Sequence, residues 1–362
     1  MQEKNLYGEA ITLLQELVST PSFSKEEDKT AAILIQFFNR KNIAVNRLLN
    51  NIWCVNKYFD KAKPSLLLNS HHDTVKPDIN YTRDPFDARI EDERLYGLGS
   101  NDAGGCLVSL IAAFLHFYER EDLKYNLILA ASAEEEISGI NGLERLLEED
   151  PAGSLFGSGK ISFAIVGEPT QTNLAIAEKG LLVLDCTCFG KAGHAAREEG
   201  DNAIYKAIKD IEWFTSYKFQ KSSDMLGEIK MSVTSIHTVN KAHNMVPSEC
   251  KFVVDVRVTD LYTHEEVLEI IGRHVLGEVI PRSLRLRSSS IDKAHPIVQA
   301  GIKLGKKTYG SPTTSDGALI NAPVLKCGPG DSARSHTANE FIYIKEIREG
   351  IDTYIGLLEA VL

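Results

Sequence analysis

The sequence has no long hydrophobic run and no excess of basic residues. Its longest strongly apolar stretch, near Leu107–Leu115, falls well short of the ~18–20 residues that a membrane span requires. Asp and Glu number 50 against 40 Lys and Arg, so the formal net charge is −10. A nucleic-acid-binding protein normally presents a basic face to the phosphates. The composition therefore argues against a membrane protein and against a partner that is nucleic acid.

Cysteine is scarce, with six residues in a chain of 362. Disulfide scaffolds are short and cysteine-dense, so we expect reduced thiols and a cytoplasmic protein. Cys186 and Cys188 share one face if their segment is a strand, and we expect both in a core. The first 18 residues have the pattern of an amphipathic helix, with no basic region followed by an apolar core, so we expect no signal peptide.

The length suggests two or three domains, and no segment repeats. Strand and helix patterns alternate in the first part of the chain, which predicts a mixed or parallel sheet with helices on both faces. The predicted strands are Pro64–Ser70, Asn126–Ala133 and Ile161–Gly167, and the predicted helices are Leu6–Val18, Glu26–Lys41, Asn101–Tyr118 and Ile140–Leu147.

The middle of the chain follows a different order, β-α-β-β-α, which is typical of a small α+β sandwich. After about residue 290 the α/β pattern of the first part of the chain resumes, with a strand predicted over Ala322–Cys327 and a helix over Ile344–Val361. We therefore expect an α/β fold in which residues 1–178 and 289–362 form one domain. Residues 179–288 form a second domain inserted into the first.

Potential metal ligands follow closely after four of the apolar runs. They are His71 and Asp73, the triplet Glu134–Glu136, Glu168, and finally His336. In open α/β sheets, sites form beyond the carboxyl ends of strands, so these groups can converge on one cleft. Each feature alone also has a structural explanation: a polar strand end for His71, a solvated turn for the Glu triplet, and a helix N-terminus for Asp102.

A combined site would contain two imidazoles and three carboxylates. The residues are His71, Asp102, Glu136, Glu168 and His336. Mixed His and carboxylate ligation suits catalytic zinc, with cobalt or manganese as alternatives, and paired metals are a known hydrolytic arrangement. Glu135 is left over beside Glu136 as a natural general base. Asp73, two residues after His71, could orient the imidazole through its second ring nitrogen.

Six motifs in this order resemble the dizinc aminoacylase/carboxypeptidase family, which includes acetylornithine deacetylase and succinyl-diaminopimelate desuccinylase. They are Ser70–Val75 (SHHDTV), Gly97–Gly105 (GLGSNDAGG), Ala133–Glu136 (AEEE), Val166–Thr170 (VGEPT), Gly190–His194 (GKAGH) and Thr314–Gly317 (TSDG). The resemblance implies a zinc-peptidase-like catalytic domain, with a mixed sheet flanked by helices. It implies that the inserted domain is a lid through which the chain forms a homodimer.

The resemblance also implies roles for the residues. His71 and Glu168 would hold one metal, Glu136 and His336 the other, and Asp102 would bridge them. Metal-bound hydroxide would attack the amide with Glu135 as general base and Asp73 orienting His71. His194 of the lid would stabilise the oxyanion, in its own or the partner's site. The Asn101–Asp102 peptide would be cis.

The implied substrate is a small N-acyl amino acid, and we expect N-acetyl-L-ornithine, or a succinyl-ornithine or citrulline derivative, in arginine biosynthesis. The resemblance implies substrate contacts from Asn244, Arg257, Thr314, Ser315 and Gly317, although Arg257 could instead form an ion pair on its strand. Desuccinylases usually carry Arg where this chain has Leu181-Leu182 and Arg-Phe where it has Ala318-Leu319, which favours a deacetylase. The alternatives are a dipeptidase, tripeptidase or carboxypeptidase of the same family, the desuccinylase itself, or a binding protein that kept the fold.

Overall fold

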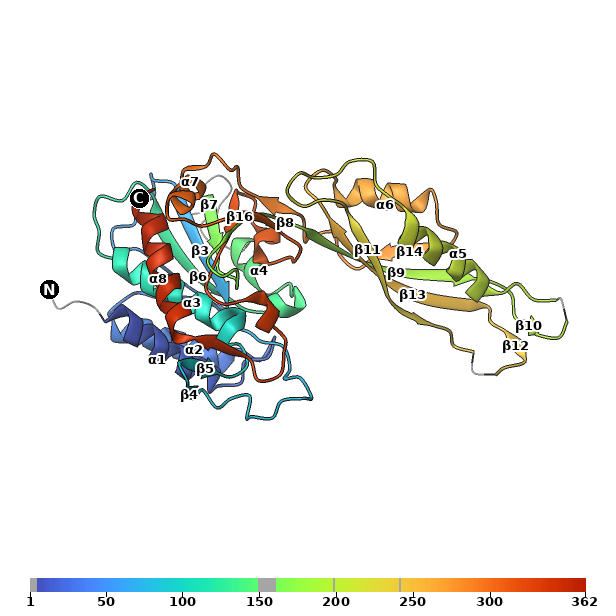
Figure 1. Cartoon of the computed structure of the whole chain (residues 1–362), viewed down its shortest axis with the longest axis horizontal. Helices are drawn as coiled ribbons and strands as arrows, with labels where there is room; N and C mark the ends of the chain where they lie inside the picture. Colours follow the sequence, from blue (N-terminus) through green and yellow to red (C-terminus); the bar gives the residue numbers. More distant parts are fainter. Residues whose placement is uncertain (1–4, 149–160, 198, 241) are drawn as a thin grey trace. The chain divides into compact units, whose positions relative to one another are not determined.

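The computed structural model describes residues 5–148, 161–197, 199–240 and 242–362, and the chain divides into two compact units (Figure 1). Unit 1 comprises Met1–Ile176, Ser290–Tyr309 and Ser315–Leu362, and unit 2 comprises Ala177–Ser289 and Gly310–Thr314. The chain therefore leaves unit 1 and returns to it. Among the described residues, every helix is too short or too polar to pass through a bilayer.

Unit 1 is built on a mixed sheet whose strand order is β1-β2-β6-β3-β7-β17-β8-β15, with β16 paired to β8. The strands β6, β3, β7 and β17 are parallel neighbours, whereas β2 and β8 join this core antiparallel. The prediction of a mixed sheet is thus confirmed. The strands are β1 (Asn46–Leu48), β2 (Asn51–Val55), β3 (Ser65–His71), β6 (Asn126–Ser132), β7 (Ile161–Val166), β8 (Leu174–Glu178), β15 (Ser289–Ser290), β16 (Thr308–Ser311) and β17 (Val324–Lys326).

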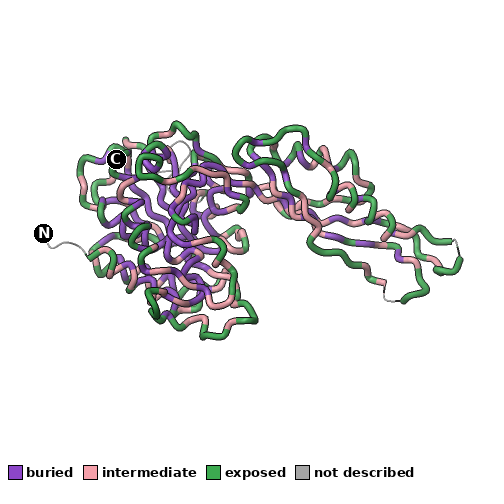
Figure 2. Tube along the Cα trace, viewed as in Figure 1, coloured by how far each residue is buried: buried purple, intermediate pink, exposed green. Residues whose placement is uncertain are grey.

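Helices cover both faces of this sheet because its central strands are apolar on both sides. Leu66 and Leu68 of β3 pack into the larger core with helices α1, α3 and α8, and Leu67 packs into a smaller core with α4. Figure 2 shows the buried sheet at the centre of unit 1. The helices are α1 (Leu6–Val18), α2 (Asp28–Arg40), α3 (Gly105–Phe117), α4 (Leu143–Glu148), α7 (Pro296–Lys303) and α8 (Ile344–Glu359).

A small separate sheet in unit 1 has the order β18-β5-β4. Its strands are β4 (Ile90–Glu91), β5 (Arg94–Tyr96) and β18 (Phe341–Tyr343). Short turns complete the unit: η1 (Ser100–Gly104), η2 (Glu135–Ile137), η3 (Asp316–Leu319) and η4 (Ser332–Arg334). These strands have only two or three residues each, too few to show a hydrophobic period, so the sequence analysis does not predict them.

Unit 2 contains a four-stranded antiparallel sheet in the order β11-β13-β9-β14 and a two-stranded pair, β10-β12. Buried residues alternate along β9, because helices α5 and α6 cover one face. Cys186 and Cys188 lie on that face and are buried, as expected. The elements are β9 (Gly180–Phe189), β10 (Gly193–His194), α5 (Ala203–Ser216), β11 (Lys230–His237), β12 (Met245–Val246), β13 (Glu249–Val258), α6 (His264–Gly272) and β14 (Glu278–Pro281).

The segment Gly310–Thr314 also belongs to unit 2, although the sequence analysis places it in the domain that resumes at residue 289. A Cβ atom added to Gly310 would lie 2.1 Å from the carbonyl oxygen of Met225, so the two backbones touch. Thr314 Oγ1 donates a hydrogen bond of 2.8 Å to the carbonyl oxygen of Lys179. Such contacts between distant segments leave no local signal in the sequence.

We expect Leu68→Ala to lower the free energy of unfolding by ~2–5 kcal/mol, because Leu68 is fully buried in β3 and its truncation leaves a cavity. Urea unfolding followed by circular dichroism measures this change. Ile79→Ala is the control, since Ile79 is 97% exposed and its truncation should change stability by less than ~0.5 kcal/mol. Equal effects of the two substitutions would contradict this description of the core.

Candidate metal centre

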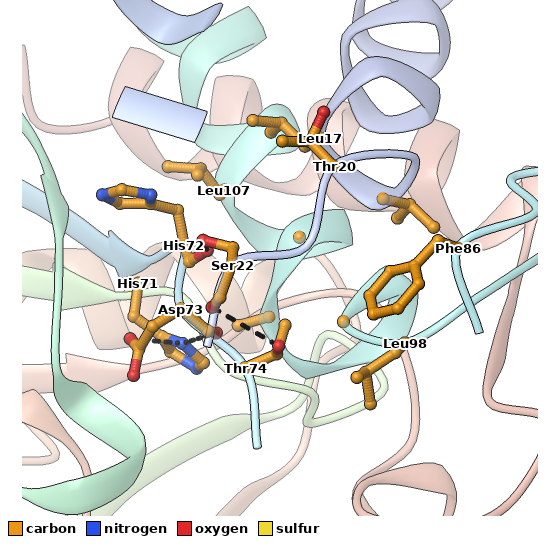
Figure 3. A pocket seen from close by; sticks show the side chains of 14 residues that line it. Leu17, Thr20, Ser22, His71, His72, Asp73, Thr74, Phe86, Leu98 and Leu107 are labelled. Atoms are coloured by element: carbon orange, nitrogen blue, oxygen red, sulfur yellow. Dashed lines mark hydrogen bonds and ion pairs between the residues drawn. The ribbon is translucent and has the colours of Figure 1, made fainter. Parts of the chain in front are cut away.

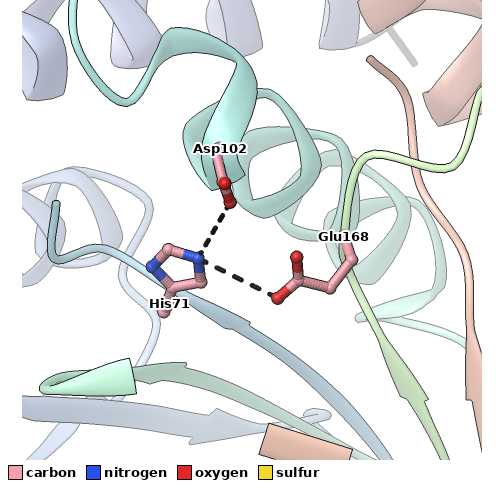
Figure 4. Close-up of side chains that lie close together, drawn as sticks. All are labelled: His71, Asp102 and Glu168. Atoms are coloured by element: carbon pink, nitrogen blue, oxygen red, sulfur yellow. Dashed lines mark ion pairs between the residues drawn. The ribbon is translucent and has the colours of Figure 1, made fainter. Parts of the chain in front are cut away.

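Two groups of potential metal ligands lie side by side in unit 1, and they share Asp102. In the first, His71 Nε2 lies 3.4 Å from Asp102 Oδ1 and 3.9 Å from Glu168 Oε1 (Figure 4). In the second, His336 Nε2 lies 3.6 Å from Asp102 Oδ2 and 2.9 Å from Glu136 Oε2. The two oxygens of Asp102 therefore face different histidines, which is the geometry of a bridging carboxylate.

The sheet brings these side chains together. His71 is the last residue of β3, and its Cα pairs in register with Ser132 at the end of β6. Glu136 follows β6 within four residues, and Glu168 follows β7 within two. Since β3, β6 and β7 are parallel, their carboxyl ends meet at one edge of the sheet.

Asp102 comes from the turn η1, directly before α3. The predicted helix Asn101–Tyr118 thus begins later, at Gly105. The expectation of a cis Asn101–Asp102 peptide was wrong, because the cis bond joins Asp102 to Ala103. The N–H groups of Asn101 and Asp102 both donate to Glu340 Oε1, at 2.8 and 2.9 Å, so one acceptor holds two successive peptide N–H groups just before the cis bond.

The cluster has the chemistry of a cation site. Burial raises the pKa of Glu168 to about 8, with Lys326 opposing and Asp102 adding to the shift. The hydrogen bond to Glu136 raises the pKa of His336 to about 9. His71 Nε2 is buried among these carboxylates and makes no hydrogen bond. Divalent cations would satisfy this orphaned nitrogen and offset the repulsion between the carboxylates, so the residues fit a pair of metal ions.

Asp73 holds both His71 and the Glu135-Glu136 turn. His71 Nδ1 lies 3.0 Å from the backbone carbonyl oxygen of Asp73 and 3.4 Å from its Oδ1, so the carbonyl is the nearer acceptor. The Asp73 carboxylate accepts from the N–H of Glu135 at 3.1 Å and of Glu136 at 3.2 Å, and from Ser24 Oγ at 2.7 Å. The Asp73 side chain thus fixes the turn that carries Glu135 and Glu136, a contact that could not be read from the sequence.

Glu135 belongs to neither ligand group, but its Oε2 lies 4.0 Å from His71 Nε2. Burial raises its pKa well above the usual range, and the charges of Glu168, Asp316 and Glu136 add to the shift against the opposing charge of His71. Asp316 itself accepts hydrogen bonds from Asn69 Nδ2 at 2.9 Å and Ser132 Oγ at 2.5 Å. A raised pKa suits a group that exchanges protons near neutral pH.

His72 points away from His71 and Asp73, as the alternation of a strand predicts (Figure 3). Its Nδ1 lies 2.9 Å from Thr30 Oγ1, its Nε2 lies 2.9 Å from the carbonyl oxygen of Asn50, and burial lowers its pKa to about 4. A cavity of about 20 Å³ in this region has room for one water molecule and no substrate. His72 is therefore a neutral structural residue.

Four of the predicted site residues belong to unit 2: His194, Asn244, Arg257 and Thr314. His194 lies on β10, where its Nδ1 accepts from the N–H of Ala196 at 3.1 Å. This hydrogen bond leaves the proton of the neutral ring on Nε2. Asn244 is exposed, and its carbonyl oxygen accepts from the N–H of Ala195 at 2.9 Å.

The Arg257 guanidinium donates two hydrogen bonds to the Asp255 carboxylate, from Nε to Oδ1 at 2.8 Å and from Nη2 to Oδ2 at 2.9 Å. This is the strand ion pair that the sequence analysis gives as the alternative to a substrate contact. Its Nη1 also donates to Thr314 Oγ1 at 3.4 Å. In unit 1, Ser315 is buried and its Oγ accepts from the N–H of Gly317 at 3.2 Å, which begins the turn η3.

Comparison with known proteins agrees with this geometry. Residues 67–360 match the model of peptidase family M20/M25/M40. A curated relative, the succinyl-diaminopimelate desuccinylase of Orientia tsutsugamushi (strain Boryong), is 24% identical over 325 residues, which cover 83% of this chain and 82% of the relative.

Two solved structures share the fold. A tripeptidase from Staphylococcus aureus aligns with a TM-score of 0.76 at 21% identity, covering 98% of each chain. A dinuclear metal-binding peptidase of the M20 family from Bacillus subtilis aligns with a TM-score of 0.74 at 16% identity, covering 99% of each chain. The predicted fold class and enzyme class are thereby confirmed: the chain is a metallohydrolase and belongs to peptidase family M20/M25/M40.

Proposed function

We propose that the protein is a metal-dependent amidohydrolase that removes the N-acyl group from an amino acid. The observation that carries this proposal is the position of Asp102 between two ligand groups, with Glu135 beside them and part of neither. Two cations held around a shared carboxylate, with a free carboxylate next to them, suit the hydrolysis of an amide.

The proposed cofactors are two divalent ions, and the mixed imidazole and carboxylate donors favour zinc, with cobalt or manganese as alternatives. His71 and Glu168 would hold one ion, Glu136 and His336 the other, and Asp102 would contact both. When bound, the ions would lower the pKa of a water molecule toward ~7 and polarise the scissile carbonyl. The Bacillus subtilis relative, which is described as dinuclear, supports this pair.

In the proposed mechanism, Glu135 takes a proton from the attacking water and delivers it to the nitrogen of the leaving amine. Asp73 keeps Glu135 in place through the backbone of the turn. His194 would donate a hydrogen bond from its Nε2–H to the developing oxyanion. Asn244, Arg257, Thr314, Ser315 and Gly317 remain proposed substrate contacts, and for Arg257 a substrate carboxylate would have to replace Asp255.

The proposed substrate is N-acetyl-L-ornithine, or a succinyl-ornithine or citrulline derivative, in arginine biosynthesis. Leu182 is fully buried in the core of unit 2, and Ala318 and Leu319 are half-buried. These positions offer no guanidinium where desuccinylases usually carry one, which supports an acetyl rather than a succinyl-diaminopimelate substrate.

The second candidate is succinyl-diaminopimelate desuccinylase, because the Orientia relative bears that name. Burial lowers the pKa of Lys179, and the positive charges of Lys230 and Arg257 add to this shift while Glu228 opposes it. These cations in unit 2 could meet an acidic acyl group in place of the missing arginine. A third candidate, a peptidase, has the support of the Staphylococcus aureus tripeptidase, which shares the fold.

A homodimer through unit 2 and a cytoplasmic location remain part of the proposal. β11 is an edge strand, and Ile236 on it is 52% exposed, so a partner could pair with it. All six cysteines are unpaired and buried, which suits a reducing compartment.

A substrate panel tests the proposed function. We expect the zinc-loaded protein to hydrolyse N-acetyl-L-ornithine faster than N-succinyl-L-ornithine, N-acetyl-L-citrulline, N-succinyl-diaminopimelate and a tripeptide, and to lose this activity in a chelator. The release of free amine measures each rate. Preference for the diaminopimelate derivative would establish the second candidate, and cleavage of the tripeptide alone would establish the third.

Glu135→Gln removes the proposed base and keeps its volume. We expect kcat to fall by ~10²–10⁴-fold, because general acid–base catalysis contributes about this much. Metal content, measured by atomic emission, should not change. Glu134→Gln is the matched control, since Glu134 accepts from Asn141 Nδ2 at 3.1 Å and belongs to neither ligand group. An active Glu135→Gln enzyme would contradict the assignment.

His194→Ala tests the proposed oxyanion donor. We expect kcat to fall by ~10²–10³-fold, the usual loss when one such donor is removed, with two ions still bound. Steady-state kinetics at fixed zinc measures the change. His237→Ala, which removes an exposed histidine of the same unit, is the control. Equal kinetics of the two variants would remove His194 from the mechanism.

A further inference from the structure

Glu340 is a buried carboxylate that the mechanism above does not use. It is 2% exposed, and it accepts three backbone hydrogen bonds from the loop that carries Asp102. Its Oε1 accepts from the N–H of Asn101 at 2.8 Å and of Asp102 at 2.9 Å, and its Oε2 accepts from the N–H of Gly99 at 3.1 Å. One side chain thus satisfies three of the loop's buried donors.

The small sheet places Glu340 under this loop. Phe341 of β18 pairs with Tyr96 of β5, and the N–H of Gly97 donates to the carbonyl oxygen of Glu340 at 2.9 Å. The chain then turns directly from β5 into the loop, where Gly99 has a φ of +78°. The register of β18 against β5 therefore determines which side chain faces the three N–H groups.

A second set of hydrogen bonds joins the same two segments. Asn101 Nδ2 donates to the carbonyl oxygen of Asp331 at 3.0 Å and to Ser335 Oγ at 3.3 Å. Asn101 Oδ1 accepts from the N–H of Asp331 at 3.0 Å. His336, the histidine of the second ligand group, lies on this segment, four residues before Glu340. Hydrogen bonds therefore join the loop of Asp102 to the segment of His336 at two places. Glu340, which follows His336 in the chain, accepts from the loop, and Asn101 bonds to Asp331 and Ser335, which precede it.

We propose that Glu340 is a positioning residue that fixes Asp102 and His336 relative to each other and so preorganises the second metal site. Glu340 is not a member of either ligand group, and its hydrogen bonds to the loop go to backbone N–H groups. Groups that orient metal ligands commonly contribute 10–100-fold to metal affinity. The inference rests on the proposed dinuclear site and adds a residue to it.

Without the Glu340 carboxylate, three buried N–H groups lose their acceptor, which is costly when water cannot replace it. The loop would relax, and the two oxygens of Asp102 would no longer face His71 and His336 together. The second group should suffer more than the first. It depends on His336, which is 55% exposed at its side chain and joined to Glu340 through one short segment, whereas His71 is held by β3 and Asp73.

Cobalt titration of the full-length protein tests the proposal. Bound Co²⁺ is followed by its visible absorption and by calorimetry, in Glu340→Ala, Glu340→Gln and the wild type. We expect the second ion to bind ~10–100-fold more weakly in Glu340→Ala. Glu340→Gln should show a smaller loss, because one oxygen remains to accept from the loop. The first ion should bind nearly as in the wild type, and excess cobalt should restore kcat.

Asp210→Asn is the matched control, because Asp210 is another buried carboxylate that accepts backbone N–H groups, at 2.9 Å from both Leu276 and Gly277, but in unit 2. It should bind two ions with wild-type affinity. The melting temperature of each metal-free variant shows whether the fold survives, and if Glu340→Ala does not fold, Glu340→Gln decides.

Unchanged affinity for both ions in the folded Glu340 variants would overturn the proposal, whatever their melting temperatures, because Glu340 would then only support the fold. A wild type that binds fewer than two ions would instead overturn the dinuclear site itself, and with it the role of Glu340. The two failures are therefore distinguishable.

Discussion

Carboxylates that lie close together in a largely buried part of unit 1 repel one another, and this repulsion is the constraint on the candidate metal centre. The side chains of Asp102, Glu136 and Glu168 are only 13%, 7% and 12% exposed, and each lies near the others. Burial raises the pKa of Glu168 to about 8, and the negative charges of Asp102 and Glu136 add to this shift. Two bound divalent cations would turn this repulsion between carboxylates into attraction to the cations, because the same negative charges would then serve as metal ligands.

Backbone N–H groups and the sheet keep this cluster together. The parallel strands β3, β6 and β7 end at one edge and bring His71, Glu136 and Glu168 to it. Two further carboxylates act on the loops instead of on the proposed ions: Asp73 accepts from the turn of Glu135 and Glu136, and Glu340 accepts from the loop of Asp102. The carboxylates of Asp73 and Glu340 thus fix the backbone of the two loops that carry candidate ligands.

His71, Glu136 and Glu168 could be predicted as candidate ligands because each follows an apolar run closely, and strands of such runs end together in an α/β sheet. Asp102 instead precedes an apolar helix, and only the structure shows that it lies between the two groups. The sequence could not show the role of Glu340, because nothing near residue 340 indicates that β18 pairs with β5. It could not show that the Asp73 carboxylate accepts from Glu135 and Glu136, since this depends on the direction of two N–H groups. For Arg257 the sequence left open a substrate contact or an ion pair on its strand, and the structure shows a bidentate pair with Asp255.

The most direct test of the account is a crystal structure of the zinc-loaded protein with anomalous diffraction measured at the zinc edge. We expect two anomalous peaks on either side of Asp102, one beside His71 and Glu168 and the other beside Glu136 and His336. A single peak, or two peaks that do not share Asp102, would contradict the central claim that this carboxylate holds two metal ions.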